Sequence, residues 1–267
     1  MVTKQENRWL SYARLVWQLV RADMTVYRGI VAEQLINTVA WVGPTVLVTT
    51  YAFPLLGIAK GFGAFIAVAS IVSVSLFQAF AAATAFVGDL EGNQTISFPL
   101  TLPMPSWLVF VQRSVSYVCK ASILSIIVLP LGKLILLDKL SFANFSIVKF
   151  VVMFFAVHIF SSFFSLLLVS MVDSMSQIMK VWLRFIFPMW FFGCSQYPWS
   201  ILHQLSPKLA YACLANPFVY AMEGIRAAVL GQEGSLSYWP CVGMLLVFAT
   251  LCGVVATRRL KKRLDFV

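Results

Sequence analysis

Six long apolar segments dominate the sequence, at 31–57, 63–88, 108–132, 147–172, 178–193 and 238–257. A helix needs about 20 mostly apolar residues to cross the hydrocarbon core of a bilayer. A soluble domain of 267 residues could not hide so much apolar surface, because its exterior must still be wetted. The sequence therefore predicts an all-α membrane protein with six transmembrane helices in a single domain over 1–267.

The composition excludes several other classes of protein. Hydrophobic residues make up 60% of the chain, charged residues only 11%, and the mean hydropathy is +0.87. An ordinary soluble domain has about 25% charged residues, so a cytosolic enzyme, a disordered chain and a disulfide-stapled secreted domain do not fit. A transmembrane β-barrel is a poor fit because it would show alternating segments of about ten residues.

A segment ahead of the first apolar run, 7–28, has polar residues at every third or fourth position. These residues are Asn7, Ser11, Arg14, Gln18, Arg21, Thr25 and Arg28. The spacing places them on one face of a helix, and mostly Trp, Leu, Val and other apolar residues occupy the opposite face. Such a helix is typical of the lipid headgroup plane, so we predict an interfacial amphipathic helix that contacts membrane lipid.

Basic residues gather at the two ends of the chain, which has a formal net charge of +10. They are Lys4, Arg8, Arg14, Arg21 and Arg28 before the first apolar run and Arg258, Arg259, Lys261, Lys262 and Arg263 after the last. Basic residues favour the cytoplasmic side of a membrane. We therefore predict that both termini are cytoplasmic, which requires an even number of spans, and we expect no nucleic-acid partner.

Between the fifth and sixth predicted spans, residues 194–237 are apolar but interrupted by Pro198, Pro207 and Pro217. They are too broken for a span and too apolar for a solvated loop, which predicts an outer re-entrant helical hairpin buried against protein. A disulfide within or beside this region is one possibility. The cysteines concerned are Cys194, Cys213 and Cys241.

Three residues within the predicted spans are candidates for lining a substrate path: Lys120, His158 and Trp190. A charge at the centre of a span costs about 2.5–3.5 kcal/mol, so Lys120 should snorkel, pair with protein or face a path. His158 either forms a hydrogen bond across helices or relays protons. Trp190 belongs to an aromatic run that serves either as a membrane-interface belt and for packing, or as a stacking surface for sugar rings or flat hydrophobic molecules.

The sequence contains no motif for chemistry of its own. It lacks the GxxxxGK[ST] phosphate loop, the HExxH zinc motif and the GxSxG nucleophile motif. No span has the central carboxylates expected of an ion-driven pump. We therefore expect no catalytic residue, no metal and no cofactor in this chain, and any energy for transport must come from another subunit.

Two segments of the sequence carry motifs. The first is Asp89-x-Glu91-Gly92-x-x-Thr95 followed by Pro103. The second, which is the more specific, is Ala215-Asn216-Pro217-Phe218-x-Tyr220-x-x-Glu223-Gly224-Ile225-Arg226. The first resembles the first cytoplasmic loop of ABC type-2 exporter permeases and thereby predicts a coupling loop over 89–105, and the second resembles the signature of the same family between the fifth and sixth spans. With the order of the other elements, the resemblance covers essentially the whole chain.

The resemblance implies a half-transporter in a bacterial cytoplasmic (inner) membrane. A partner ATPase subunit would hold ATP and Mg²⁺, and a second copy of this chain or a related permease would complete a dimer. The exported substrate would be hydrophobic or amphipathic, such as a drug, a lipid or a lipid-linked glycan. The alternatives are a non-transport membrane scaffold or assembly factor and, as a third interpretation, a passive channel.

Roles for particular residues follow from these segments. Asp89 and Glu91 would offer acceptors to the ATPase, and Thr95 would cap a coupling helix; a solvated turn is the alternative. Asn216 and Pro217 would end one helix and begin the next. Glu223 and Arg226 lie three residues apart on one helix face and would pair as a structural clamp of the outer hairpin.

Overall fold

The computed structural model describes residues 8–58, 61–89, 91, 106–140, 142–172 and 174–264. These residues form helices and connecting turns, without a β-strand among them. The first half contains α1 Arg8–Tyr27, α2 Val31–Tyr51, the 3₁₀ turn η1 Phe53–Leu56, α3 Phe62–Gly88, α5 Ser106–Ile126, α6 Val128–Leu136 and the 3₁₀ turn η3 Leu137–Lys139. The second half contains α7 Ile147–Met171, α8 Met175–Val181, the π-helical turn η4 Trp182–Ile186, α9 Phe187–Phe192, α10 Trp199–Leu205, α11 Pro207–Cys213, α12 Pro217–Val229 and α13 Tyr238–Leu264.

Five helical segments are long and apolar enough to cross a membrane. They are Val31–Tyr51, Phe62–Gly88, Leu108–Leu136, Ile147–Met171 and Tyr238–Lys262. The third combines α5 and α6, which follow one another with a single turn residue between them. Within the described residues, the prediction of an all-helical chain with several helices long and apolar enough to cross a membrane is therefore confirmed, at this coarse level.

The fifth predicted span, 178–193, corresponds to three short helices placed end to end. The helices α8, η4 and α9 have seven, five and six residues. Pro188 lies in the first turn of α9, where the missing N–H of a proline is tolerated. The π turn before it shifts the hydrogen-bond pattern, so the segment is helical without interruption but is not a regular α-helix.

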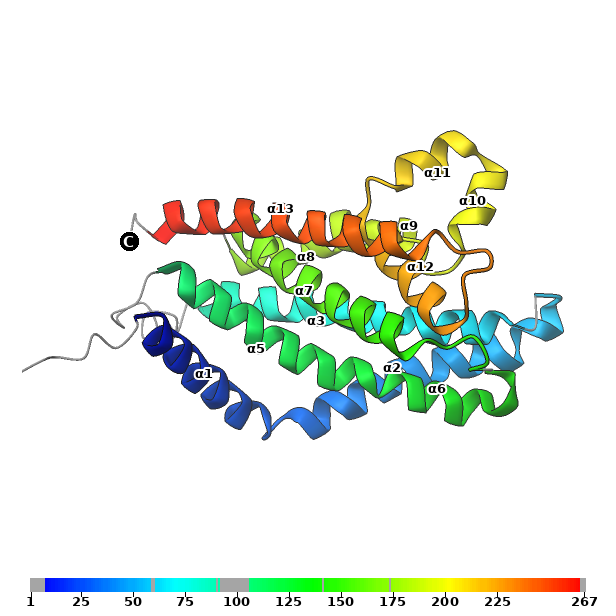
Figure 1. Cartoon of the computed structure of the whole chain (residues 1–267), viewed down its shortest axis with the longest axis horizontal. Coiled ribbons are helices and arrows are strands. Elements are labelled where there is room, and N and C mark those ends of the chain that lie inside the picture. Colours follow the sequence, from blue (N-terminus) through cyan, green and yellow to red (C-terminus); the bar gives the residue numbers. More distant parts are fainter. Residues whose placement is uncertain are drawn as a thin grey trace, which may run out of the picture.

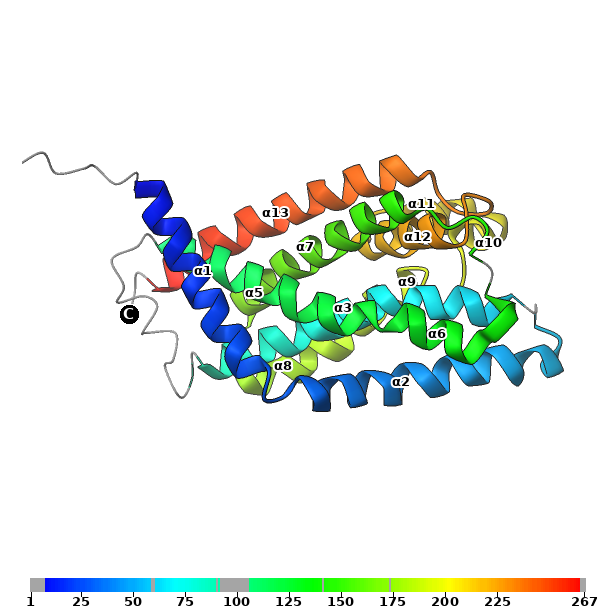
Figure 2. The ribbon, with the colours of Figure 1, turned by 60° about the horizontal axis from the view of Figure 1, so that its bottom comes forward.

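The long helices run side by side along the long axis of the molecule (Figure 1). Helix α1 crosses obliquely at one end, beside the beginning of α5, and the end of α13 lies there too (Figure 2). Helices α10 and α11 lie at the opposite end. We call these the α1 end and the α10 end. Of the predicted amphipathic segment 7–28, Arg8–Tyr27 thus forms one helix packed on α5, and Asn7 lies outside the described residues.

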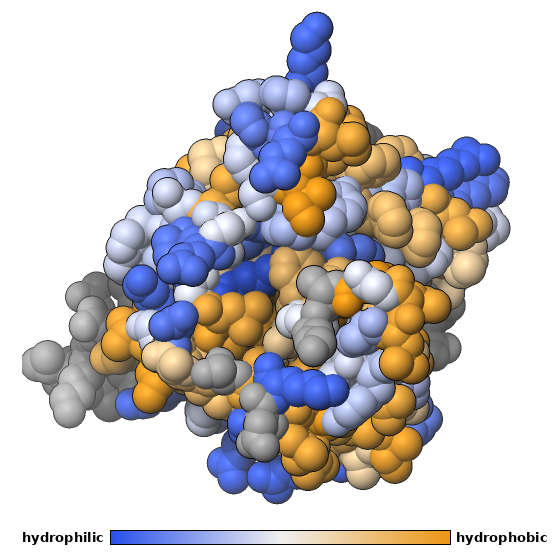
Figure 3. Space-filling model, turned by 90° about the vertical axis from the view of Figure 1, so that its right-hand side faces the viewer, coloured by the Kyte–Doolittle hydropathy of each residue, from blue (hydrophilic) through white to orange (hydrophobic). Residues whose placement is uncertain are grey.

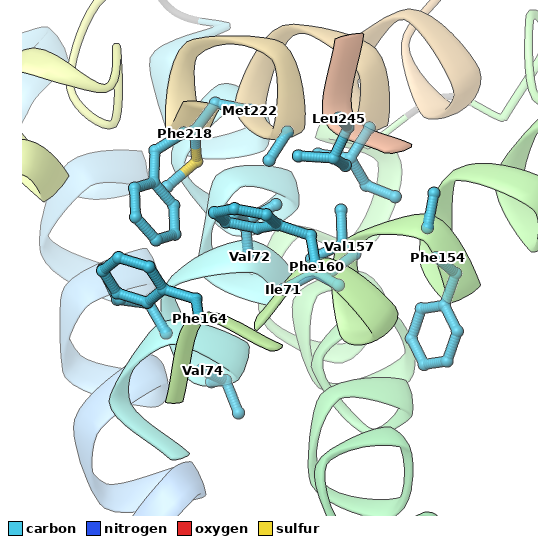
Figure 4. Packing of buried hydrophobic residues seen from close by; sticks show 14 of the residues in the cluster. Ile71, Val72, Val74, Phe154, Val157, Phe160, Phe164, Phe218, Met222 and Leu245 are labelled. Carbon is cyan, nitrogen blue, oxygen red and sulfur yellow. The ribbon is translucent and has the colours of Figure 1, made fainter. Parts of the chain in front are cut away.

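The centre of the bundle is built from α3, α7, α12 and α13, of which α7 and α12 each pack against the other three. Figure 4 shows Val72 of α3, Phe160 of α7 and Met222 of α12 meeting in this core. The Phe160 and Phe218 rings lie edge to face with their centroids 5.4 Å apart, a favourable arrangement for aromatic pairs. Small residues in α3 bring its backbone close to its neighbours, and α3 is the most buried of the five apolar segments.

The surface differs between the flanks and the α10 end. Large apolar side chains such as Leu134, Val148 and Leu183 are exposed along the flanks. On the face at the α10 end, hydrophilic and hydrophobic residues are mixed and the surface is hollowed near its middle (Figure 3). Apolar flanks with a more polar end are what a helical bundle requires when lipid surrounds it and water covers its ends.

Candidate functional site

Helix α12 is anchored by the Asn216–Pro217 break that the sequence predicted. The Asn216 side-chain oxygen accepts a hydrogen bond from the Phe218 backbone N–H at 3.1 Å, and Pro217 occupies the first helical turn. The Asn216 side-chain amide also donates to the Met189 carbonyl of α9 at 2.6 Å. All 13 residues of α12 are buried. One asparagine therefore caps this buried helix and ties it to α9.

The buried helix carries an ion pair between Glu223 and Arg226. Their exposed fractions are 0% and 1%, and Nη1 of the arginine lies 3.3 Å from Oε1 of the glutamate. Nη2 of Arg226 donates to the Ser195 carbonyl at 2.9 Å. Its guanidinium carbon lies 3.5 Å from the centroid of the Phe65 ring, in cation–π contact.

Both carboxylate oxygens of Glu223 accept backbone hydrogen bonds. The Trp199 N–H donates to Oε1 and the Leu236 N–H donates to Oε2, each at 3.1 Å. The pair thus joins α12 to the segments on either side of it, before α10 and before α13. Buried charges are tolerated when such hydrogen bonds compensate them. Of the four residues predicted as a clamp, Glu223 and Arg226 contact segments of the predicted outer hairpin, whereas the Asn216 side-chain amide contacts α9.

A second cluster of polar groups surrounds a cavity of about 250 Å³ toward the α1 end. It lies among α1, α2, α3, α5 and α7. Its charged and polar lining consists of Asp23, Tyr27, Gln34, Gln78, Asp89, Arg113, Ser114, Ser116, Tyr117, Lys120, Ser162 and Ser165. The concentration of ionisable groups beside helices that can cross a membrane marks this cavity as a candidate functional site.

Asp23 attaches α1 to α5 within this cavity. Its Oδ2 accepts hydrogen bonds from Gln112 Nε2 and Ser116 Oγ, both at 2.7 Å. Asp23 lies on the apolar face of the amphipathic helix, opposite the stripe of polar residues. An acidic residue in that position was the sequence signal for this contact, although our sequence analysis did not assign it to a site.

A second ion pair connects α3 to α5. Arg113 Nη2 lies 3.7 Å from Asp89 Oδ2, with both side chains 30% exposed. The arginine also lies 5.5 Å from the centroid of the Phe86 ring. Of the predicted coupling residues, Asp89 therefore contacts the helix that follows the loop, and Glu91 is exposed. Thr95 lies outside the described residues.

The three predicted path residues have separate surroundings. Lys120 lines the cavity, and its ammonium lies 5.7 Å from the centroid of the Tyr27 ring. His158 is completely buried, with Nδ1 2.6 Å from the Phe154 carbonyl and Nε2 3.1 Å from Ser125 Oγ. The contact with Ser125 joins α7 to α5, which is the predicted hydrogen bond across helices, and the Phe154 carbonyl belongs to α7 itself.

Trp190 packs on the side of α3. Its Nε1 donates to Ser73 Oγ at 2.8 Å, and its ring centroid lies 6.0 Å from that of Phe77. This is the packing interpretation of the aromatic run, with one ring hydrogen-bonded into the bundle. Lys120 is therefore the predicted path residue that lines the polar cavity.

All five cysteines are free thiols, so the possible disulfide in the outer region is absent. Burial raises the pKa of Cys194 to about 12, and the nearby Glu223 carboxylate adds to this shift.

Within the described part of the chain, no group of three His, Cys, Asp or Glu residues could hold a metal ion. Comparison with protein-family models, curated proteins and solved structures finds no match to the chain.

Proposed function

We propose that the chain is the membrane-embedded permease subunit of an ATP-driven exporter, with the α1 end facing the cytoplasm. The observation that carries the proposal is the polar network at that end. Asp23 ties α1 to α5, and the Asp89–Arg113 pair ties the end of α3 to the same helix. The helices on both sides of the predicted 89–105 loop are thereby connected to each other and to α1.

This network suits the transmission of a movement. An ATPase subunit that displaces the 89–105 loop would pull on the end of α3 and the beginning of α5 at once. The Asp89–Arg113 pair is partly exposed, so breaking and remaking it costs little. Asp23 would carry the same displacement to α1. Substrate would then leave between this subunit and a second permease copy.

The path of the chain supports six crossings in this proposal. The described segment starts and ends at the α1 end (Figure 1), which requires an even number of passes between the two ends. Five come from the apolar segments, and Met175–Phe192 supplies the sixth. Its three short helices extend about 27 Å at 1.5 Å per residue, close to the thickness of a hydrocarbon core.

A wide groove on the side of the bundle supports an amphipathic substrate. It has a volume of about 620 Å³ and lies among α7, α8, η4, α9, α13 and the beginning of α12. Apolar residues such as Phe164, Leu168 and Phe185 form most of its lining, while Lys180 and Arg184 contribute positive charge. A molecule with an apolar body and an anionic or polar head would find both kinds of contact there.

Purification of the tagged protein in mild detergent from its native host tests the proposal. We expect an ATPase subunit and a second permease copy to be recovered with it. Substituting Glu91→Arg should reduce recovery of the ATPase, because Glu91 is an exposed residue of the predicted loop. The matched control is Glu233→Arg, which makes the same change at an exposed position between α12 and α13.

Three outcomes would count against the proposal. Normal ATPase recovery with Glu91→Arg would refute the docking role of this residue. Recovery of neither an ATPase nor a second copy would favour a scaffold or assembly factor. Ion conductance of the purified chain in liposomes without ATP would favour a passive channel.

A further inference from the structure

Two adjoining cavities form a furrow on the bundle among α5, α7 and α13, which lie side by side (Figure 2). Their volumes are about 480 Å³ and 250 Å³, and Val111 of α5 and Phe163 of α7 line both. Apolar and exposed side chains such as Val115, Ile159 and Val254 belong to its walls. We call this surface the α5–α13 furrow. It shares no lining residue with the wide groove beside α8 and α9, so it is a separate site.

The α5–α13 furrow begins near the α1 end and has the length of one membrane leaflet. Arg258 lies near the end of α13 and Ala249 nine residues before it, which corresponds to about 14 Å at 1.5 Å per residue. The wall on α5 extends over the same number of residues, from Phe110 to Cys119. Because a hydrocarbon core is about 30 Å thick, the furrow covers about half of it.

The walls of the furrow offer contacts to hydrocarbon rather than free hydrogen-bond donors. The hydroxyls of Thr250 and Thr257 donate to carbonyls of their own helix at 2.8 Å and 2.7 Å. The Ser162 hydroxyl donates to the Ser114 carbonyl at 3.3 Å, and the Ser114 hydroxyl oxygen is itself buried. A hydroxyl that is bonded to backbone needs no further partner. An apolar chain therefore fits these walls better than a sugar or a peptide.

Positive charge gathers at the α1 end of the furrow. Arg258 is the charged residue among those that line the furrow, and its side chain is exposed. Within the described part of the chain, Arg258 forms no ion pair. Residues 258–267 contain five basic residues and one acidic residue, so this end of the chain has a surplus of positive charge. Basic groups at the end of a membrane helix attract anionic headgroups.

We infer that the α5–α13 furrow binds an acyl chain of a membrane phospholipid with an anionic headgroup, and that Arg258 contacts its phosphate. The apolar walls bury the hydrocarbon, and a guanidinium can donate two hydrogen bonds to one phosphate. A zwitterionic lipid has the same acyl chains but brings a cationic group close to Arg258, so the charge of the headgroup should select the lipid. The inference requires that the chain lies in a membrane and does not rest on export.

Thermal unfolding of the full-length chain in detergent micelles tests the inference with three probes. Dioleoylphosphatidylglycerol is anionic, and dioleoylphosphatidylcholine has the same acyl chains with a zwitterionic headgroup. Glycerophosphoglycerol has the anionic headgroup without acyl chains. We expect phosphatidylglycerol to raise the melting temperature of the wild type at concentrations at which neither of the other probes does.

Two variants with matched controls locate the binding site. Arg258→Gln removes the charge that lines the furrow and should weaken phosphatidylglycerol binding about tenfold. Arg259→Gln removes the same charge from an exposed residue that lines neither cavity and should have a much smaller effect. Thr250→Trp fills the furrow and should also weaken binding. Val247→Trp adds the same ring system at an exposed position outside the furrow and should bind like the wild type.

All four positions are exposed, so these variants should fold, and the melting temperature without lipid verifies this. The inference is overturned if no probe raises the melting temperature of the wild type or if phosphatidylcholine does so as well as phosphatidylglycerol. Equal binding of glycerophosphoglycerol would also overturn it, because the acyl chain would then contribute nothing. So would a variant of either pair that binds phosphatidylglycerol as tightly as its control. No ATPase takes part in these measurements, so their failure is distinct from a failure of the export proposal.

Discussion

Arg226 neutralises a carboxylate that has no access to water. Removing one partner of a buried ion pair leaves the charge of the other uncompensated, which lowers the free energy of unfolding by about 3–5 kcal/mol. Arg226→Met should therefore destabilise the protein by this amount, because it leaves Glu223 buried and uncompensated. Lys208→Met, at an exposed position on α11, should have little effect. Thermal unfolding of the detergent-solubilised protein measures both.

The double variant Glu223→Gln/Arg226→Met separates the charge effect from the loss of packing. The neutral amide can still accept from Trp199 or Leu236, so the double variant should be more stable than Arg226→Met alone. Equal stability of the two would argue that Arg226 acts through its contact with the Phe65 ring rather than by neutralising Glu223.

Cys194 should be a very poor nucleophile. Burial raises the pKa of its thiol from an ordinary 9.0 to about 12, so at pH 7 about a thousandfold less of it is thiolate than for an exposed cysteine. We expect maleimide to label Cys194 only after unfolding. Mass spectrometry of the labelled peptides measures this, with Gln204→Cys as an exposed control on α10. Rapid labelling of Cys194 in the folded protein would show that this segment opens.

At the level of single residues, the sequence predicted contacts between near neighbours best. The pairing of Glu223 with Arg226 follows from a spacing of three residues in one helix. The stacking of Arg226 on Phe65 and the hydrogen bonds from Gln112 and Ser116 to Asp23 depend on tertiary packing. No spacing between neighbouring residues indicates these contacts, so the polar cavity could not be predicted from the sequence.

Close packing of α2 on α3 depends on a glycine at the beginning of α3. A Cβ atom on Gly63 would lie 2.8 Å from the backbone Cα of Thr50, so the helices themselves would have to separate. Gly63→Ala should therefore destabilise the protein by about 1–3 kcal/mol. Gly43→Ala is the control on α2, because a Cβ there meets no atom within 4 Å. That change should be neutral or stabilising by up to about 1 kcal/mol in thermal unfolding, and equal losses for both would contradict the packing argument.

Among the elements, apolar runs located the long helices but prolines and glycines set their ends. The first predicted span, 31–57, is helical as α2 only to Tyr51, and a 3₁₀ turn follows that ends at Gly57 with a positive φ of 82°. Pro207 and Pro217 each occupy the first turn of a short helix, as their residue type favours. The complete burial of α12 was not predictable, because it depends on where α3, α7 and α13 leave room for it.

The described chain starts and ends at the same end of the molecule (Figure 1). Together with the five long apolar segments, this makes Met175–Phe192 the segment that decides the topology. A sixth crossing there would place both termini on one side of the membrane, and its absence would place them on opposite sides. The membrane sides of Leu10, near the beginning of α1, and Lys262, near the end of α13, distinguish the two arrangements.

Both positions are exposed and can be replaced by cysteine. In intact cells, a membrane-impermeant maleimide should label neither Leu10→Cys nor Lys262→Cys, and after permeabilisation it should label both. Gln204→Cys on α10 should react in intact cells, because the α10 end would face outward, and the wild type supplies the background from the native thiols. If Lys262→Cys alone reacts from outside, then Met175–Phe192 does not cross the membrane. If Leu10→Cys reacts as well, the α1 end faces outward and cannot receive a cytoplasmic ATPase.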